Sequence, residues 1–122
     1  MKKTVLLTLA TAFVLLILHS CEKACTEEFR MVTITVNGDQ LDDFYTLRLS
    51  SGDTIRYDNG NVMDSTTYVV LDDSYQMMLE NKTDSFRFEG ILNDSLMVSE
   101  VFIIKADECH IEYISGKQTV NM

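Results

Sequence analysis

The stretch Met31-Val-Thr-Ile-Thr-Val-Asn-Gly-Asp39 decides the fold class. Val32, Ile34 and Val36 recur at every second position with polar or flexible residues between them, which is typical of a β-strand with one buried face. The Asn-Gly-Asp that follows supplies residues that favour a turn. This stretch therefore predicts a strand that ends in a tight turn.

Similar short runs recur along the rest of the chain at roughly ten-residue spacing. They cover residues 44–50, 54–57, 66–71, 86–89, 96–105, 109–115 and 119–120. Asn93-Asp94-Ser95 predicts a turn before the run that begins at residue 96. In the first of these runs, Tyr45, Leu47 and Leu49 share one face. Residues 75–80 suit one helical turn or a short strand equally well, and no helical stretch is long enough for a parallel β-α-β crossover. We predict an all-β fold, a single antiparallel β-sandwich of about seven to eight short strands over residues 29–122.

Composition and charge narrow the class of protein. The chain has 122 residues, of which 46% are apolar, enough for one hydrophobic core and too many for a disordered chain. Ten Lys and Arg stand against 19 Asp and Glu, a net charge of −9. A negatively charged protein repels the phosphate backbone of nucleic acids, so we predict no nucleic-acid partner.

The N-terminus has the pattern of a secretory signal peptide. Lys2 and Lys3 precede an apolar run from Val5 to Leu18, which is shorter than the twenty or so residues that a membrane-spanning helix needs. We predict that residues 1–20 form a signal peptide that is removed. The alternative is a buried N-terminal helix of a soluble domain.

Leu18-His-Ser-Cys21 resembles the lipobox of bacterial lipoproteins. His19 departs from the commoner small residue of that motif, a change that the looser lipoboxes of Bacteroidetes tolerate. The resemblance implies cleavage before Cys21, attachment of a diacylglycerol to its thiol and acylation of the new amino group, for example with palmitate. Residues 21–28 would then form a lipid anchor and a short tether to a membrane. The alternative is ordinary cleavage that leaves Cys21 free.

The chain has three cysteines, and lipidation of Cys21 leaves two for pairing. An exported protein lies in an oxidising compartment, so we predict a disulfide between Cys25 and Cys109. Two free thiols or a metal site are the alternatives. The sequence contains no Cys-x-x-Cys pair, and His110 is the only histidine after residue 20, so we predict no metal and no cofactor.

Taken together, the chain resembles small cell-envelope lipoproteins of Bacteroidetes with an immunoglobulin-like or transthyretin-like sandwich. The resemblance rests on the lipobox, on Lys23-Ala-Cys25, and on Asp107-Glu-Cys-His-Ile-Glu-Tyr-Ile-Ser-Gly116. It implies a location in the bacterial cell envelope and carries no assigned chemistry. Glu22, in place of the aspartate that retains enterobacterial lipoproteins in the inner membrane, favours the outer membrane.

Catalytic groups are sparse in the sequence. His110 is the one candidate base, and we interpret it as a strand side chain at the surface or at a sheet edge. An enzyme would need a pocket around His110 with a carboxylate and a hydroxyl within hydrogen-bond reach, and we predict no catalytic residue. Residues 58–64 bring Asp and Asn oxygens together without the spacing of a calcium loop.

Three hydroxyl residues resemble the short O-glycosylation sequon of Bacteroides-type bacteria, in which Asp precedes Ser or Thr and an aliphatic residue or Thr follows. These are Thr54, Ser65 and Ser95. The resemblance implies that one or more of them carries a glycan.

The sequence favours a membrane-anchored, non-enzymatic lipoprotein with a binding, assembly or structural role and a protein or glycan partner in the envelope. The alternative is an accessory glycan- or peptide-binding domain beside an outer-membrane transporter. That alternative predicts an exposed aromatic cluster built from such residues as Phe44, Tyr57 or Tyr75.

Overall fold

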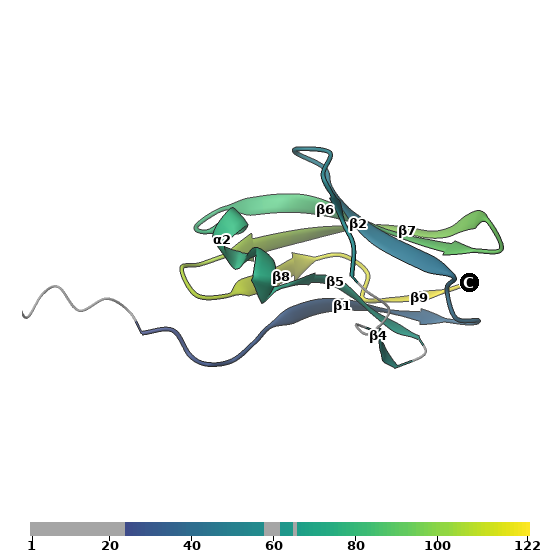
Figure 1. The fold of residues 1–122 in the computed structure, drawn as a ribbon, viewed down its shortest axis with the longest axis horizontal. Helices are drawn as coiled ribbons and strands as arrows, with labels where there is room; N and C mark the ends of the chain where they lie inside the picture. Colours follow the sequence, from purple (N-terminus) through teal and green to yellow (C-terminus); the bar gives the residue numbers. More distant parts are fainter. Residues whose placement is uncertain (1–23, 58–61, 65) are drawn as a thin grey trace, which may run out of the picture.

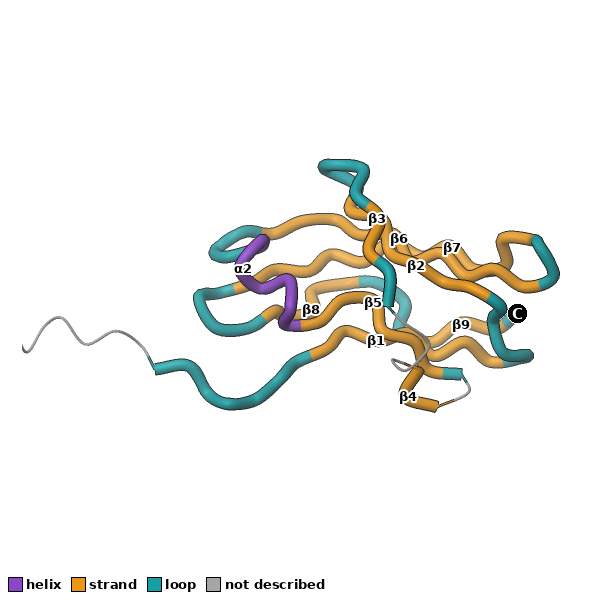
Figure 2. Tube along the Cα trace, in the orientation of Figure 1, coloured by secondary structure: helices purple, strands orange, loops and turns teal. Residues whose placement is uncertain are grey.

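The structure, a computed structural model, describes residues 24–57, 62–64 and 66–122. These residues form two β-sheets that face each other across a shared core (Figure 1). Strands make up most of these described residues and helices very few of them (Figure 2). The prediction of an all-β, sandwich-like fold is therefore confirmed at the level of two packed sheets.

The first sheet has the strand order β4-β5-β1-β9 and the second has the order β3-β2-β6-β7-β8. The strands of the first sheet are β1 (Met31–Asn37), β4 (Val62–Asp64), β5 (Thr67–Asp72) and β9 (Thr119–Asn121). Those of the second are β2 (Asp43–Arg48), β3 (Thr54–Ile55), β6 (Thr83–Leu92), β7 (Ser95–Ala106) and β8 (Ile111–Ser115).

One strand pair departs from the predicted antiparallel arrangement. β1 pairs with β5 in the antiparallel sense but with β9 in the parallel sense. Parallel neighbours need a long connection, and here the whole chain between the first and the last strand supplies it. The described residues also contain nine strands, more than the seven to eight predicted; the strand that no predicted run covers is the three-residue β4.

The stretch that the sequence left open between helix and strand is helical. A 3-10 turn, Asp73–Tyr75, leads into α2, Gln76–Leu79. Leu79 is fully buried, so this single turn closes one end of the core between β5 and β6. In the part of the chain that the structure describes, no helix is long and apolar enough to cross a membrane.

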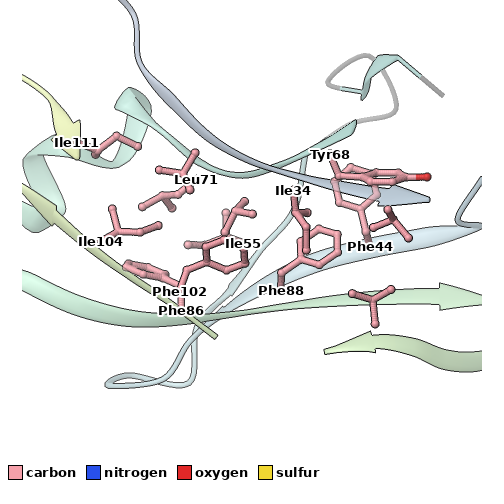
Figure 3. Packing of buried hydrophobic residues seen from close by; sticks show 14 of the residues in the cluster. Ile34, Phe44, Ile55, Tyr68, Leu71, Phe86, Phe88, Phe102, Ile104 and Ile111 are labelled. Atoms are coloured by element: carbon pink, nitrogen blue, oxygen red, sulfur yellow. The ribbon is translucent and has the colours of Figure 1, made fainter. Parts of the chain in front are cut away.

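The core lies between the sheets and takes its side chains from both of them (Figure 3). Val32, Ile34 and Val36 of β1 point inward as the alternation predicts. They meet aromatic rings of the second sheet, among them Phe86 and Phe88 of β6, which are fully buried.

In β2 the buried side is the opposite of the face on which Tyr45 and Leu47 lie. Phe44 and Thr46 are buried instead. Thr46 lies opposite Phe88 of β6, and residues directly opposite each other in an antiparallel pair point to the same face. The Thr46 hydroxyl donates a 2.7 Å hydrogen bond to the carbonyl oxygen of Val70 in the other sheet, which satisfies this buried polar group.

β6 and β7 form a long hairpin whose two-residue turn is Asn93-Asp94. Both residues have positive φ, 52° and 60°, as a turn of type I′ requires. Asn and Asp tolerate that conformation better than other residues with a side chain, which explains why the turn lies where the sequence predicts it.

The predicted strand 109–115 begins two residues later than expected. Cys109 and His110 lie in the turn between β7 and β8, because Asp107 Oδ1 accepts hydrogen bonds from both of their main-chain N–H groups, at 2.7 and 2.8 Å. A side chain that captures nearby N–H groups in this way competes with strand pairing.

Candidate functional site

The predicted disulfide between Cys25 and Cys109 is present. It joins the segment that precedes β1 to the turn between β7 and β8, across a sequence separation of 84 residues. Residues 25–28, which the sequence assigns to the tether, therefore begin at a covalent cross-link to the domain.

Asp73 lies beside this cross-link and holds three groups from two other segments. Its side chain is only 8% exposed. The carboxylate accepts hydrogen bonds from the main-chain N–H groups of Arg30 and Ile111, each at 2.8 Å, and from Nδ1 of His110 at 2.7 Å. One side chain thus joins the entry to β1 with the start of β8.

These hydrogen bonds keep Asp73 ionised. Burial by itself raises the pKa of the Asp73 carboxyl, but the two main-chain N–H donors and His110 outweigh burial, so its pKa lies below the ordinary value. An ionised carboxylate only accepts hydrogen bonds, so Nδ1 of His110 carries a hydrogen. In the neutral imidazole Nε2 is then an acceptor.

His110 is not the exposed or edge strand residue that the sequence predicts. Its side chain is 9% exposed, and Nε2 lies 2.9 Å from Oγ1 of Thr26. The prediction is wrong because Asp107 places His110 in a turn, where the ring fits between Asp73 and the N-terminal segment. We call Cys25, Thr26, Arg30, Asp73, Cys109 and His110 the N-terminal clamp.

The clamp contains the three groups that an enzyme would need around His110. A hydroxyl, an imidazole and a carboxylate stand in the order used by hydroxyl-nucleophile hydrolases. The depression beside them holds about 150 Å³, whereas ligand pockets usually hold about 300–1,000 Å³. The disulfide, the Thr26–His110 contact and the Arg30–Asp73 hydrogen bond all join the N-terminal segment to the domain, so we interpret the clamp as structural.

A second feature lies next to the clamp, between residues 28–32 and residues 111–113. These two segments border an open groove of about 410 Å³, the corner groove. Phe29 and Met31 on one wall and Tyr113 on the other keep much of their apolar surface exposed. The clamp fixes both walls, because Asp73 binds Arg30 and Ile111 directly.

The chain matches no protein-family model, no curated protein and no solved structure. The interpretation of the clamp and of the corner groove therefore rests on their own geometry.

The other predicted residues are dispersed. Thr54 at the start of β3 and Ser95 at the start of β7 are exposed, and they lie on different strands, away from the clamp. Cys21, Ser65 and most of the acidic stretch 58–64 fall outside the described residues. Among the residues that are described, no group of His, Cys, Asp and Glu could hold a metal ion.

The aromatic residues named for a ligand-binding surface do not form an exposed cluster. Phe44 is buried, while Tyr57 and Tyr75 are partly buried and pack against the core. The Tyr57 hydroxyl accepts a hydrogen bond from the main-chain N–H of Asp72 at 3.0 Å. These three rings therefore contribute to packing and do not form an exposed aromatic surface for a ligand.

The sequence missed Asp73, Thr26 and the corner groove. Asp73 is 37 positions from His110, and neither residue belongs to a motif that links them. The one available signal was the cysteine pair, since a bridge to Cys109 necessarily brings Thr26 close to His110.

Proposed function

We propose that this chain is a lipid-anchored protein of the bacterial cell envelope with a non-enzymatic binding or assembly role. Residues 1–20 act as a signal peptide, and Cys21 becomes the lipidated first residue of the mature chain. The outer membrane is the proposed location.

The disulfide is the observation that carries this proposal. Stable disulfides form in oxidising compartments outside the cytoplasm, so the Cys25–Cys109 bond supports export. The bond also uses two of three cysteines. Cys21, which follows the lipobox-like Leu18-His-Ser, is thus the cysteine left for lipid.

The cross-link also sets how far the domain stands from its anchor. Three residues separate Cys21 from Cys25, and a fully extended chain spans at most about 3.3–3.6 Å per residue. The clamp then lies within about 14 Å of the lipidated residue. A domain held so close to a membrane suits a role beside another component of the same membrane rather than binding to a distant partner.

The structural interpretation of the clamp supports a non-enzymatic role. The alternative of an accessory glycan-binding domain draws no support from Phe44, Tyr57 and Tyr75, because none of them is exposed as a platform. A peptide or protein partner fits the corner groove better, as argued below. Thr54 and Ser95 are exposed and remain the proposed glycan carriers in the described part of the chain.

The proposal is tested by labelling bacterial cells that express the chain with radioactive palmitate. We expect the wild-type protein to take up label and to stay with membranes in a high-salt wash. Cys21→Ser should lose both properties. Cys25→Ser is the matched control, because it breaks the disulfide while leaving the lipobox-like sequence intact, and it should stay labelled.

Intact mass completes the experiment. The expected mass is that of residues 21–122 plus acyl chains, and added sugar masses that disappear in Thr54→Val or Ser95→Ala would locate glycans. An unlabelled wild-type protein that salt releases contradicts lipid anchoring. Hydrolysis of a p-nitrophenyl ester by the pure protein, lost in Thr26→Val, contradicts the non-enzymatic role.

A further inference from the structure

Several strands that the structure describes are paired along only part of one edge, among them β7, which β8 covers only at Ile103–Ala106; two such free edges border the corner groove. A free edge presents unpaired N–H and C=O groups, and proteins protect such edges by making them short or by placing charge or proline there. β3, β4 and β9 contain two or three residues each. β8 has five residues, and β9 covers β1 only at Thr35–Asn37, so the first half of β1 is also free.

The free half of β1 turns main-chain groups toward the corner groove. The N–H of Thr35 donates to the carbonyl of Gln118 beside β9, at 2.8 Å. Main-chain groups two residues apart in a strand point the same way, so those of Met31 and Thr33 point to the side on which β9 has ended. β1 contains no charged residue, and the chain contains no proline, so this edge lacks the usual protection.

The edge of β8 that borders the corner groove also has main-chain groups that point away from the neighbouring strand. The N–H of Ile111 donates to Asp73 rather than to β7. The main-chain groups of Tyr113, two residues further on, therefore also point away from β7. Two free edges thus border one groove and the clamp holds them in place; that of β1 has no charged residue, and that of β8 has one, Glu112.

We propose that the corner groove binds an extended, basic segment of a partner protein, which adds a β-strand along the free half of β1 and lies against β8. Main-chain groups of Met31 and Thr33 would bond the added strand, and the exposed apolar side chains of Phe29, Met31 and Tyr113 would contact alternate side chains of the partner. This proposal deepens the binding role proposed above and rests on it.

The negative charge of the chain indicates which kind of segment the corner groove binds. The chain carries a net charge of −9, so a second copy in the groove would be repelled, whereas Lys or Arg on a partner strand would be attracted. Glu28 and Glu112 lie on opposite walls with side chains 58% and 56% exposed. Their ion pairs, with Arg30 at 3.2 Å and Lys105 at 3.4 Å, are solvent-exposed and contribute little to stability, so a partner's cations can share these carboxylates.

The test uses the purified protein in a mild detergent and a fluorescent ten-residue peptide of alternating Val and Lys. We expect saturable binding by fluorescence anisotropy, weakened at least tenfold when Glu replaces Lys in the peptide and lost when the peptide main chain is N-methylated at alternate residues. Bound peptide should slow hydrogen exchange at the main-chain N–H groups of Met31 and Thr33.

Two lysine substitutions provide matched variants. Met31→Lys places a cation in the groove and should raise the Kd at least tenfold. Met97→Lys alters a methionine of similar exposure, 48% against 45%, near the β6–β7 turn, and should change the Kd less than twofold. Thr33→Pro removes the N–H that faces the groove without removing one that pairs with β5, and should also weaken binding if the variant is folded by circular dichroism.

Three results overturn the proposal: no binding of the Val-Lys peptide, equal effects of Met31→Lys and Met97→Lys, or a dimer in sedimentation that Met31→Lys dissociates. The last result would make the occupant a second copy of the chain. Palmitate labelling tests the lipid anchor independently. A protein that takes up palmitate but does not bind the peptide would contradict the docking site and leave the proposed envelope location unaffected.

Discussion

The two ends of the molecule are held together in different ways. At one end, the β6–β7 hairpin closes through Asn93 and Asp94, two adjacent residues whose positive φ angles suit the turn. At the other end, the N-terminal clamp joins Cys25 to Cys109 and Asp73 to His110. The two regions lie at opposite ends of the long axis (Figure 1).

The hairpin turn is stabilised mainly by local preferences, whereas the N-terminal clamp is stabilised by contacts between distant segments. The hairpin turn depends mainly on the φ preferences of two adjacent residues, and the hydrogen bond from the N–H of Asn93 to the distant Asp42 is exposed, so a substitution there affects stability modestly. The clamp depends on groups far apart in sequence, and those that meet at the side chains of Asp73 and His110 have a buried partner, so losing one group leaves others unpaired. We therefore expect substitutions in the clamp to cost several times more stability than those in the turn.

Removing the disulfide should have the largest effect. The double variant Cys25→Ser, Cys109→Ser opens a loop with a sequence separation of 84 residues, and the chain-entropy model predicts a loss of about 4 kcal/mol. Urea denaturation followed by circular dichroism measures the loss. Cys21→Ser, which leaves both disulfide cysteines in place, is the control and should leave the midpoint unchanged. A loss below about 1 kcal/mol in the double variant contradicts the role of the cross-link.

Asp73→Ala should cause the second largest loss of stability. It leaves the N–H groups of Arg30 and Ile111 and the His110 ring without their buried acceptor, at a cost of about 3 kcal/mol in the free energy of unfolding. Asp42→Ala is the matched control, because the Asp42 carboxylate accepts its bond from Asn93 in an exposed position. Equal losses in the two variants would show that the clamp adds nothing beyond a surface hydrogen bond.

Acid should weaken the clamp in a defined direction. The pKa of Asp73 is lowered in the folded protein, so its contribution to stability is complete above the unfolded value of about 3.9. That contribution disappears as the pH falls through the folded pKa. In Asp73→Asn, stability should therefore fall less steeply below about pH 4 than in the wild-type protein.

The turn should give the smallest effect. Asn93→Ala places alanine at a φ of 52°, where a residue with an ordinary side chain costs about 1 kcal/mol. The same denaturation experiment measures the change. Asp94→Gly is the companion variant and should preserve or slightly raise stability, since glycine takes positive φ without strain. A loss at Asn93 as large as that at Asp73 would remove the distinction between the two ends.

Much of the fold could be predicted from short stretches of sequence. The alternation in β1 and the turn residues Asn93 and Asp94 express local preferences, and the structure has both where we expected them. The side of β2 that is buried was harder to predict, because Phe44 and Thr46 point inward through their pairing with β6.

The clamp could be predicted only in part. Cysteine count and compartment suggested the disulfide, but nothing in the sequence links Asp73 to His110 or to the N–H groups of Arg30 and Ile111. The parallel pairing of β1 with β9 was also missed. Each of these depends on three-dimensional proximity between distant segments, which periodicity does not report.

The position of β9 beside β1 has a consequence for how the protein matures. A chain made from its N-terminus presents β1 first, yet Thr35–Asn37 can meet their neighbours Thr119–Asn121 only after more than eighty further residues have been made. Cys109 likewise emerges late, 84 residues after Cys25, and synthesis proceeds at roughly 5–20 residues per second. The first strand therefore waits several seconds for the last, an interval in which a chaperone has time to shield it.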